Sequence, residues 1–227
     1  MTMTTTQAAR PDRRLRRGLS IVELMVGVTI GLFILAGATM VLTTQLGDNR
    51  RLLLEAQVQQ DLRSTVDLIS REIRAAGYWG NAYTQVWKAT ATNPYSASPL
   101  VATANSTSLE YYKSLEANTD NNSIDPNEYG GFRLNASTHT IEVQLGSDNW
   151  QQLTDPAVLT VTQFTLVPNT VAVDIPPSVP GAASTLKLCS RDVTLTIIVR
   201  AVHDAAVQRS ISNRIRLRND VVKASCT

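Results

Sequence analysis

The stretch "RRLRRGLSIVELMVGVTIGLFILAG", from Arg13 to Gly37, decides the fold because it joins a cluster of arginines to an apolar run of membrane-spanning length. From Leu24 to Gly47 the chain has 24 residues without a formal charge, and about 20 such residues span the hydrocarbon core of a bilayer. The arginines ahead of this run predict that the N-terminus stays in the cytoplasm and that the chain after Gly47 is exported. In a Gram-negative cell the exported part would lie in the periplasm.

The composition allows one folded domain and an accessory segment. The chain has 227 residues, of which 43% are hydrophobic and 18% charged, which is enough for one modest core. The formal net charge is +2, but the residues before Leu19 carry +4, which leaves −2 for the remainder. A nucleic-acid-binding domain carries a basic stripe on its folded part, so we expect no direct contact with nucleic acid.

Three kinds of signal fit a basic segment followed by an apolar run. A secretory signal peptide could be cleaved at Ala36-Gly37-Ala38, but its apolar core has about 7 to 15 residues and does not begin with an acid. Here the run continues past that site, and Glu23 stands at its beginning. An uncleaved membrane anchor fits the length of the run, but it gives Glu23 no role.

The third kind of signal explains Glu23. The basic leader ends at Gly18 and is followed by "LSIVEL", which places Glu23 five residues after Gly18. This pattern resembles the class III signal of type IV pilins and type II secretion pseudopilins. The resemblance implies that prepilin peptidase cleaves between Gly18 and Leu19 and methylates the new amino group of Leu19. Glu23 then stays in an apolar helix, where a carboxylate needs a positive partner such as the new amine of an adjacent subunit.

Two glycines in the apolar run have the spacing of a helix-packing motif. Gly27 and Gly31 form a GxxxG sequence, which lets helices approach closely in membranes. Glycine is also common in membrane helices without such a role, and the sequence alone leaves both interpretations open.

The helical pattern continues beyond the apolar run. Apolar residues recur at spacings of four, three, four and three, which is the periodicity of an amphipathic helix, and Gly77 follows as a C-cap. The sequence therefore predicts one helix from Ile21 to Ala76, on the order of 84 Å long at 1.5 Å per residue, whose narrow stripe packs on a sheet. The stripe consists of Leu62, Val66, Ile69, Ile73 and Ala76.

After Gly77 the sequence changes to turns and strands. Turn dipeptides include Gly80-Asn81, Asp125-Pro126 and Gly130-Gly131. Alternating apolar residues predict strands at "LEYYK", "HTIEVQL", "VLTVTQFTLV", "VTLTIIVRA" and "ISNRIRLR", of which the last two pair antiparallel. We therefore expect an α+β protein, in which one antiparallel sheet packs on the amphipathic half of the helix. This is the type IV pilin fold that the resemblance implies.

Within that family the chain resembles PilW-type minor pilins. The resemblance lies in "REIRAAGYWG" at the end of the helix and in "LTIIVRAVHDAAVQRSISNRIRLRND" near the C-terminus. It implies a structural subunit that primes or assembles a type IV pilus, with consequences for adhesion and motility. The partners would be prepilin peptidase, other minor pilins, the major pilin and the inner membrane assembly platform, with the pilus tip as a second location besides the inner membrane.

This interpretation divides the chain into four segments: a cleaved leader (1–18), a transmembrane and assembly helix (19–47), an amphipathic helix half (48–76) and a periplasmic β-rich domain (77–227). Two alternatives remain open. A minor pseudopilin of a type II secretion system would share the signal, the helix and the sheet. A secreted surface-binding module would instead be released by signal peptidase.

The remaining residues that could carry chemistry form no recognisable site. Neither His139 nor His203 lies in a metal-binding or catalytic motif, so we expect no enzyme, no metal and no cofactor. Cys189 and Cys226 could form a disulfide in an oxidising compartment or remain free thiols. They are the only intrachain pair that the composition allows.

The segment from Thr119 to Glu128 is rich in acidic and amide side chains. This acidic loop gathers side-chain oxygens of the kind that calcium takes. They belong to Asp120, Asn122, Asp125, Asn127 and Glu128. The loop lacks the glycine and the spacing of an EF-hand. We therefore expect a solvated turn rich in Asx residues.

Overall fold

The structure is a computed structural model that describes residues 18, 20–85, 93–97, 106–116, 119–176, 186–223 and 225–226. It divides into two compact units, Met1–Asn49 and Arg50–Thr227. The first unit contributes the start of a long helix, and the second contains the rest of that helix together with all of the strands. The α+β layout predicted from the sequence, a long N-terminal helix followed by antiparallel strands, is confirmed.

Helix α1 runs from Ile21 to Ala75 and ends one residue before the predicted position. The helix ends because Gly77 adopts φ +75°, the left-handed conformation that glycine reaches without strain. The N–H of Gly77 donates to the carbonyl of Tyr112, at 2.8 Å, instead of continuing the helix. The side chain of Asn219 donates to the carbonyls of Ala75 and Ala76, at 3.3 and 3.0 Å, and so satisfies two acceptors at the helix end.

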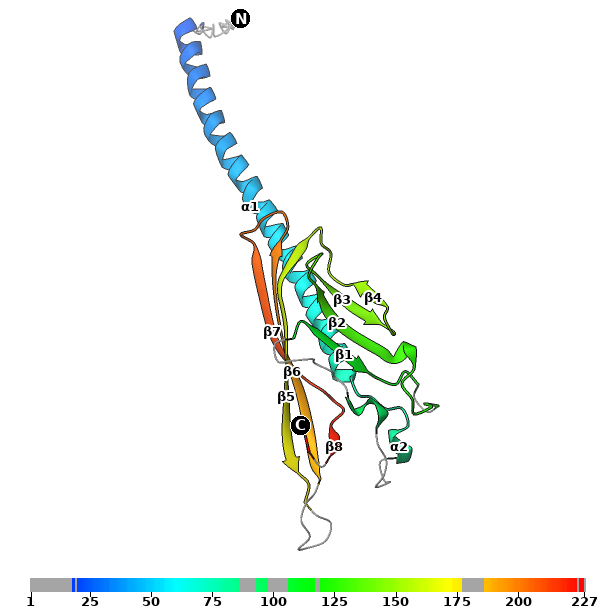
Figure 1. Cartoon of the computed structure of the whole chain (residues 1–227). Helices are drawn as coiled ribbons and strands as arrows, with labels where there is room; N and C mark the ends of the chain where they lie inside the picture. Colours follow the sequence, from blue (N-terminus) through cyan, green and yellow to red (C-terminus); the bar gives the residue numbers. More distant parts are fainter. Residues whose placement is uncertain are drawn as a thin grey trace, which may run out of the picture. The chain divides into compact units, whose positions relative to one another are not determined.

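The strands form two sheets, so the expectation of one sheet was wrong (Figure 1). In the first sheet the order is β1-β2-β3-β4, and in the second it is β5-β6-β7, with β8 also paired to β6. Every pairing is antiparallel. The bounds are β1 (Ser108–Tyr112), β2 (Tyr129–Asn135), β3 (Thr140–Leu145), β4 (Trp150–Gln152), β5 (Leu159–Asp174), β6 (Lys187–Ala201), β7 (Gln208–Arg216) and β8 (Val221–Lys223), and the short helices are α2 (Ala82–Gln85), η1 (Pro94–Ala97) and η2 (Pro126–Glu128).

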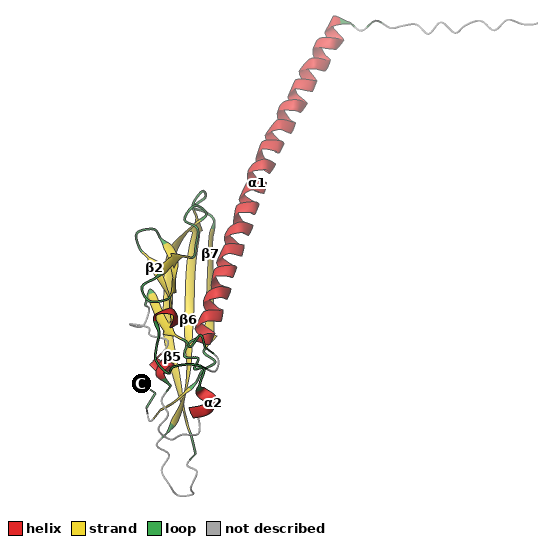
Figure 2. Ribbon diagram, turned by 90° about the vertical axis from the view of Figure 1, so that its right-hand side faces the viewer, coloured by secondary structure: helices red, strands yellow, loops and turns green. Residues whose placement is uncertain are grey.

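Two sheets fit on one helix because the buried face of α1 is wider than the predicted stripe. Besides the predicted apolar residues, Thr65 and Ser70 are buried. The amide of Asn213 in β7 donates to the hydroxyl of Ser70, at 3.1 Å, on the side of the second sheet. The hydroxyl of Tyr111 in β1 donates to Glu72, at 2.8 Å, on the side of the first sheet. Figure 2 shows the strands alongside this part of α1.

The core is a single cluster to which α1 and both sheets contribute. All five residues of the predicted helical stripe are buried, and so is the predicted inner face of β6. Burial of these side chains is the main favourable contribution to the stability of this unit. The buried residues of the stripe and of β6 are Leu62, Val66, Ile69, Ile73, Ala76, Val193, Leu195, Ile197, Val199 and Ala201.

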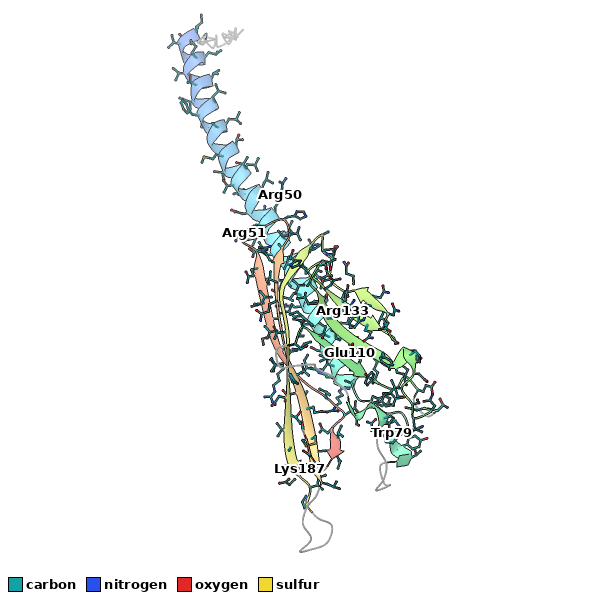
Figure 3. All side chains as sticks on the ribbon, in the orientation of Figure 1. Arg50, Arg51, Trp79, Glu110, Arg133 and Lys187 are labelled. Carbon is teal, nitrogen blue, oxygen red and sulfur yellow. A yellow bond between two sulfur atoms is a disulfide. The ribbon has the colours of Figure 1, made fainter. Side chains whose placement is uncertain are left out.

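The sequence predicted a turn at Gly130-Gly131, but both glycines lie within strand β2. In the structure Gly130 lies opposite Tyr111 of β1, and a Cβ atom on Gly130 would lie 2.3 Å from the Tyr111 ring. The glycine is therefore needed because an aromatic ring crosses the strand, which is one of the roles of glycine within sheets. On the outer face of the same sheet Glu110 is exposed, and Arg133 forms an ion pair with Glu142 at 2.6 Å (Figure 3).

Strand β5 forms one edge of the second sheet. At Leu166 its outer side is bridged by Ser106, whose carbonyl accepts from the N–H of Leu166 at 2.9 Å. From Pro168 to Asp174 every residue is exposed. Pro168 has no N–H to offer to a further strand, which is typical of edge strands.

Candidate functional site

The first half of α1 has an apolar surface that no other described residue of the chain covers. Every described residue from Gly18 to Asn49 is exposed. Among the described residues, α1 is the one helix that is long and apolar enough to cross a membrane, with a mean hydropathy of 2.3 over its most apolar window. A continuous apolar surface of this size requires lipid or other protein around it.

The four threonine hydroxyls in this half are hydrogen-bonded within the helix itself. The hydroxyl of Thr39 donates to the carbonyl of Leu35, at 2.7 Å, and those of Thr43 and Thr44 donate to Met40, at 2.9 and 3.0 Å. Thr29 donates in the same way to Met25. Each of these hydroxyls therefore needs no partner from outside the helix in an apolar environment.

Glu23 differs from these residues. It lies in the first turn of α1 and is exposed, and it is the only residue with a formal charge between Gly18 and Gly47. Within the described residues its carboxylate accepts no hydrogen bond and forms no ion pair. A carboxylate in this position needs a partner from outside the chain when lipid or protein covers the helix.

Glu23 shares a ridge of the helix with the two glycines of the GxxxG sequence. Residues spaced by four lie along one ridge of a helix, so Glu23, Gly27 and Gly31 follow one another on the same side. A Cβ atom at Gly27 or Gly31 would meet no other atom of the chain within 4 Å. Neither glycine is therefore required for packing within the described chain, and the ridge lets another helix approach next to the carboxylate.

The predicted processing site lies just ahead of this ridge. Gly18 is exposed, whereas Leu19, whose amino group would be released and methylated, lies outside the described residues. Ser20 precedes the first helical residue, and its carbonyl accepts the N–H of Leu24 at 3.1 Å. Ser20 and Glu23 also have the spacing of a capping box, a signal that the sequence analysis missed. No side-chain hydrogen bond of such a box forms between these two described residues.

In the second unit, polar contacts fix the amphipathic half of α1 to both sheets. The carboxylate of Glu72 accepts from Tyr111 and forms an ion pair with Lys113. Burial alone would raise the pKa of Glu72, but these two bonds outweigh it and lower the pKa below 4.5. Toward the second sheet, Glu55 forms an ion pair with Arg209 of β7, at 2.6 Å. These contacts hold the helix in place on both sides.

The acidic loop is the expected Asx-rich turn, exposed from Asn121 to Ser123, but the carboxylates at its two ends are buried, which was not expected. Asp120 and Glu128 are buried because Tyr95, distant in sequence, lies against them. The hydroxyl of Tyr95 donates to Glu128 at 2.8 Å, and the backbone N–H groups of Asn122 and Asp125 donate to Asp120 and Glu128 at 2.6 and 2.8 Å. Burial, followed by the contact with Glu128, raises the pKa of Tyr95. The carboxylates thus serve as acceptors that organise the loop.

The described residues contain no group of three or more His, Cys, Asp or Glu side chains arranged to hold a metal ion. His139 lies in the turn between β2 and β3, and His203 in the loop after β6. Cys189 of β6 and Cys226 form a disulfide, with Cα atoms 5.4 Å apart. This disulfide joins the C-terminal segment that follows β8 to the beginning of β6, where β8 also pairs.

Comparison with known protein families identifies a match. A family model described as PpdB, prepilin peptidase-dependent protein B, matches residues 51–217. The matched segment begins in α1 and ends just after β7, so it does not include Gly18 or Glu23. The curated proteins and the solved structures contain no match to the chain.

Proposed function

The chain belongs to the prepilin peptidase-dependent protein B family, and we propose that it acts as a minor pilin of a type IV pilus, of the PilW type. Membership of this family makes it a pilin-like protein that depends on prepilin peptidase. The family match and the N-terminal signal are independent, because the signal lies entirely outside the matched residues. Both lead to the same class of protein.

In this proposal prepilin peptidase removes residues 1–18 on the cytoplasmic side and methylates the amino group of Leu19. Residues 19–47 remain in the inner membrane as the assembly helix, residues 48–76 form the amphipathic half, and residues 77–227 form the periplasmic domain. The arginines before Gly18 support this orientation, since positive charge is retained on the cytoplasmic side.

One observation carries the proposal: the unpartnered carboxylate of Glu23 lies on one ridge with Gly27 and Gly31. When two such helices pack, the glycines permit close approach, and the amino group of one subunit can reach the carboxylate of the other. An ion pair in an apolar bundle adds little net stability, but it penalises every register in which the charge is left alone. Glu23 therefore selects the axial position of a neighbouring subunit.

We infer that the protein joins other minor pilins, and then the major pilin, on the inner membrane assembly platform. The resemblance to PilW-type minor pilins and the size of the globular part, residues 77–227, support a minor role. Adhesion and motility follow from the pili that such a complex initiates. No catalytic step is assigned to the chain.

The test is replacement of the ridge carboxylate in the full-length protein. Glu23→Gln keeps the size and polarity of the side chain but removes its charge, and Gly18→Val blocks the predicted cleavage. We expect Glu23→Gln to be cleaved normally, with a mature N-terminus at Leu19, and to reduce the number of pili per cell at least tenfold. Gly18→Val should accumulate as the unprocessed form.

The outcomes separate the alternatives. Normal piliation by Glu23→Gln would refute the role of the carboxylate, and a mature N-terminus near Thr39 would refute the proposal of a pilin. If deletion of the protein leaves pili intact but stops export of secreted proteins, the chain is a minor pseudopilin of a type II secretion system.

A further inference from the structure

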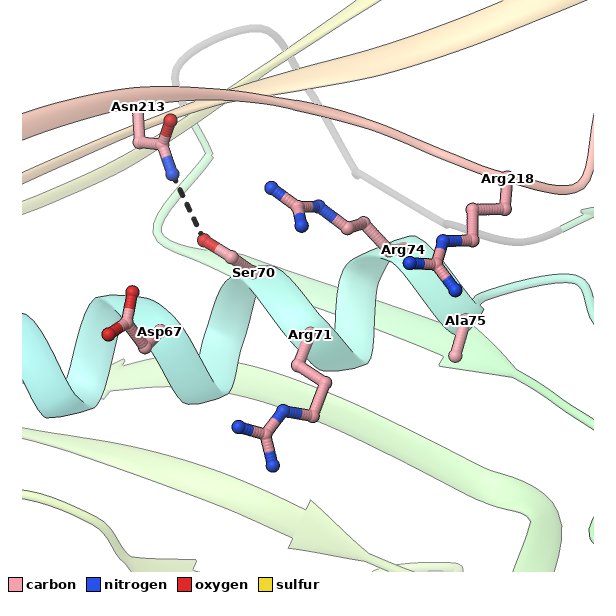
Figure 4. Close-up of a pocket in the computed structure, with 7 residues that line it drawn as sticks. All are labelled: Asp67, Ser70, Arg71, Arg74, Ala75, Asn213 and Arg218. Atoms are coloured by element: carbon pink, nitrogen blue, oxygen red, sulfur yellow. Dashed lines mark hydrogen bonds between the residues drawn. The ribbon is translucent and has the colours of Figure 1, made fainter.

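A groove runs from the end of α1 around β7 to the outer face of the second sheet. Its first part is a hollow of about 460 Å³, whose lining includes Arg71, Arg74 and Arg218 (Figure 4). A second hollow, of about 500 Å³, shares Arg74 and Arg218 and adds Arg214 and Arg216. A third, of about 450 Å³, shares the last two arginines and adds Val171, Val173 and Leu188. We refer to these three hollows together as the β7 groove.

The backbone brings two arginines of the groove together from distant parts of the chain. The N–H of Arg218 donates to the carbonyl of Arg74, at 3.1 Å, so that both side chains leave from adjacent points and line the same hollow. Neither guanidinium forms an ion pair with any residue that the structure describes. Two like charges in one hollow repel each other, and a bound anion would remove that repulsion.

The other charged residues of the first hollow do not remove the repulsion between Arg74 and Arg218. Asp67 is the only acid in the lining of this hollow, and among the described residues it forms an ion pair with none of the three arginines there (Figure 4). That leaves the charges of Arg74 and Arg218 without compensation from the lining.

The helix dipole also fails to account for this arrangement. Basic residues in the last turn of a helix offset its negative end, which accounts for Arg74, the basic residue of that turn. Arg218, however, comes from the segment after β7. The carbonyls at the helix end already accept from the side chain of Asn219 and from the N–H of Arg218. The guanidinium groups are therefore free for another acceptor.

The middle of the groove is electrically balanced. Asp192 accepts two hydrogen bonds from Arg214, both at 2.7 Å, and Arg216 forms an ion pair with Asp220, at 3.1 Å. The positive charge of the β7 groove is thus concentrated at the end formed by Arg74 and Arg218.

The opposite end is apolar. Val173 lies opposite Leu188, and Val171 opposite Ser190, in the β5–β6 pairing. Val171 and Val173 are 48% and 51% exposed, on the face of the sheet that points away from the core. The β7 groove therefore offers a cationic end, a balanced middle and an apolar end.

We propose that the β7 groove docks a polypeptide segment of another pilin-family subunit, with two or more carboxylates at one end and apolar side chains at the other. Guanidinium groups bind carboxylates in a bidentate manner, and the exposed valines match apolar side chains. A nucleic acid fits less well, because none of the residues that line the three hollows is aromatic and could stack on a base. Only the identity of the partner as a pilin-family subunit rests on the function proposed above.

The test uses the full-length protein in its own cells. p-Benzoylphenylalanine replaces Val173, which is exposed at the apolar end, and light then links it to whatever occupies the groove. The cationic end is reversed in the variant Arg74→Glu/Arg218→Glu. The matched control is Arg63→Glu/Arg200→Glu, which makes the same change of charge at exposed arginines of α1 and β6 outside the groove.

We expect an adduct with a second polypeptide whose linked segment contains Asp or Glu residues. Reversal of Arg74 and Arg218 should reduce its yield at least tenfold, while the control leaves it unchanged. Replacement of the partner's carboxylates by Lys should restore the adduct in cells that carry Arg74→Glu/Arg218→Glu. Resistance of the disulfide-bonded protein to protease, compared between the two double variants, distinguishes loss of docking from loss of folding.

Four results would overturn the proposal: no adduct, an adduct insensitive to reversal, a linked segment without carboxylates, or an adduct that nuclease removes. Pili are counted on the same cells. Normal pili in a strain that lacks the protein would refute the minor pilin function, while the adduct would still test the β7 groove.

Discussion

The packing of α1 on the two sheets can be tested with one pair of leucines on the same helix. Leu62 is 1% exposed and belongs to the core, whereas Leu53 is 72% exposed. Replacement by alanine removes the same atoms at both positions. Only the change at Leu62 leaves a cavity, because only Leu62 is surrounded by other side chains.

The expected effect of Leu62→Ala follows from its burial. A fully buried Leu→Ala replacement costs about 2 to 5 kcal/mol, which combines the lost transfer free energy with the cavity that remains. For a unit the size of Arg50–Thr227, 1 kcal/mol shifts the midpoint of thermal unfolding by about 2 to 4 °C. With a cost of about 3 kcal/mol, we expect a decrease of about 6 to 12 °C. For Leu53→Ala the change should stay within about 0.5 kcal/mol.

The assay is thermal unfolding of the purified full-length protein in detergent, followed by circular dichroism with the disulfide intact. Equal shifts for the two variants, or a decrease below about 2 °C for Leu62→Ala, would show that the helix is not held by this core. The same pair also separates folding from assembly, because Leu53 can contribute to contacts between subunits without contributing to the fold.

Three further predictions concern the second unit. The pKa of Glu72 is lowered in the folded protein, so its charge stabilises the fold above pH 4.5. This contribution is lost as the pH falls through the lowered pKa. Glu72→Gln should therefore flatten the dependence of the denaturation midpoint on pH below 4.5. Cys189→Ser/Cys226→Ser should lower the free energy of unfolding by about 4 kcal/mol, from the entropy of the loop that the disulfide closes, as measured in urea. Gly130→Ala should force the Tyr111 ring out of its position and cost about 1 to 3 kcal/mol in the same assay.

The helix and the central strands could be predicted because their patterns are local. Leu62, Ile69 and Ile73 repeat with the period of a helix, and the inner face of β6 repeats with the period of a strand. Each pattern needs only one buried side, so the sequence near each residue was sufficient. The pairing of β6 with β7 followed from their short connection.

The features that could not be predicted depend on residues that meet only in the folded chain. Gly130 looked like a turn residue, because the Tyr111 ring that requires a glycine belongs to another strand. Glu128 looked solvated for the same reason, since Tyr95 covers it from a separate segment. Arg74 and Arg218 are adjacent only because the chain after β7 returns to the end of α1.

The candidate site divides in the same way. Glu23, Gly27 and Gly31 were identified from spacing within one helix. The wider buried face of α1, which accommodates a second sheet, could not be foreseen from apolar residues alone, because Thr65 and Ser70 contribute to it. Ser70 is buried there with a partner from β7.

The proline in β5 bears on how such a subunit avoids forming the wrong polymer. An unpaired strand edge can recruit strands from other copies and grow into an amyloid-like fibre. On the outer side of β5, Ser106 occupies the position beside Leu166, and Pro168 withdraws a hydrogen-bond donor two residues later. Two copies that meet along this edge are thereby discouraged from pairing strand to strand, so the exposed end of β5 is protected against fibre formation.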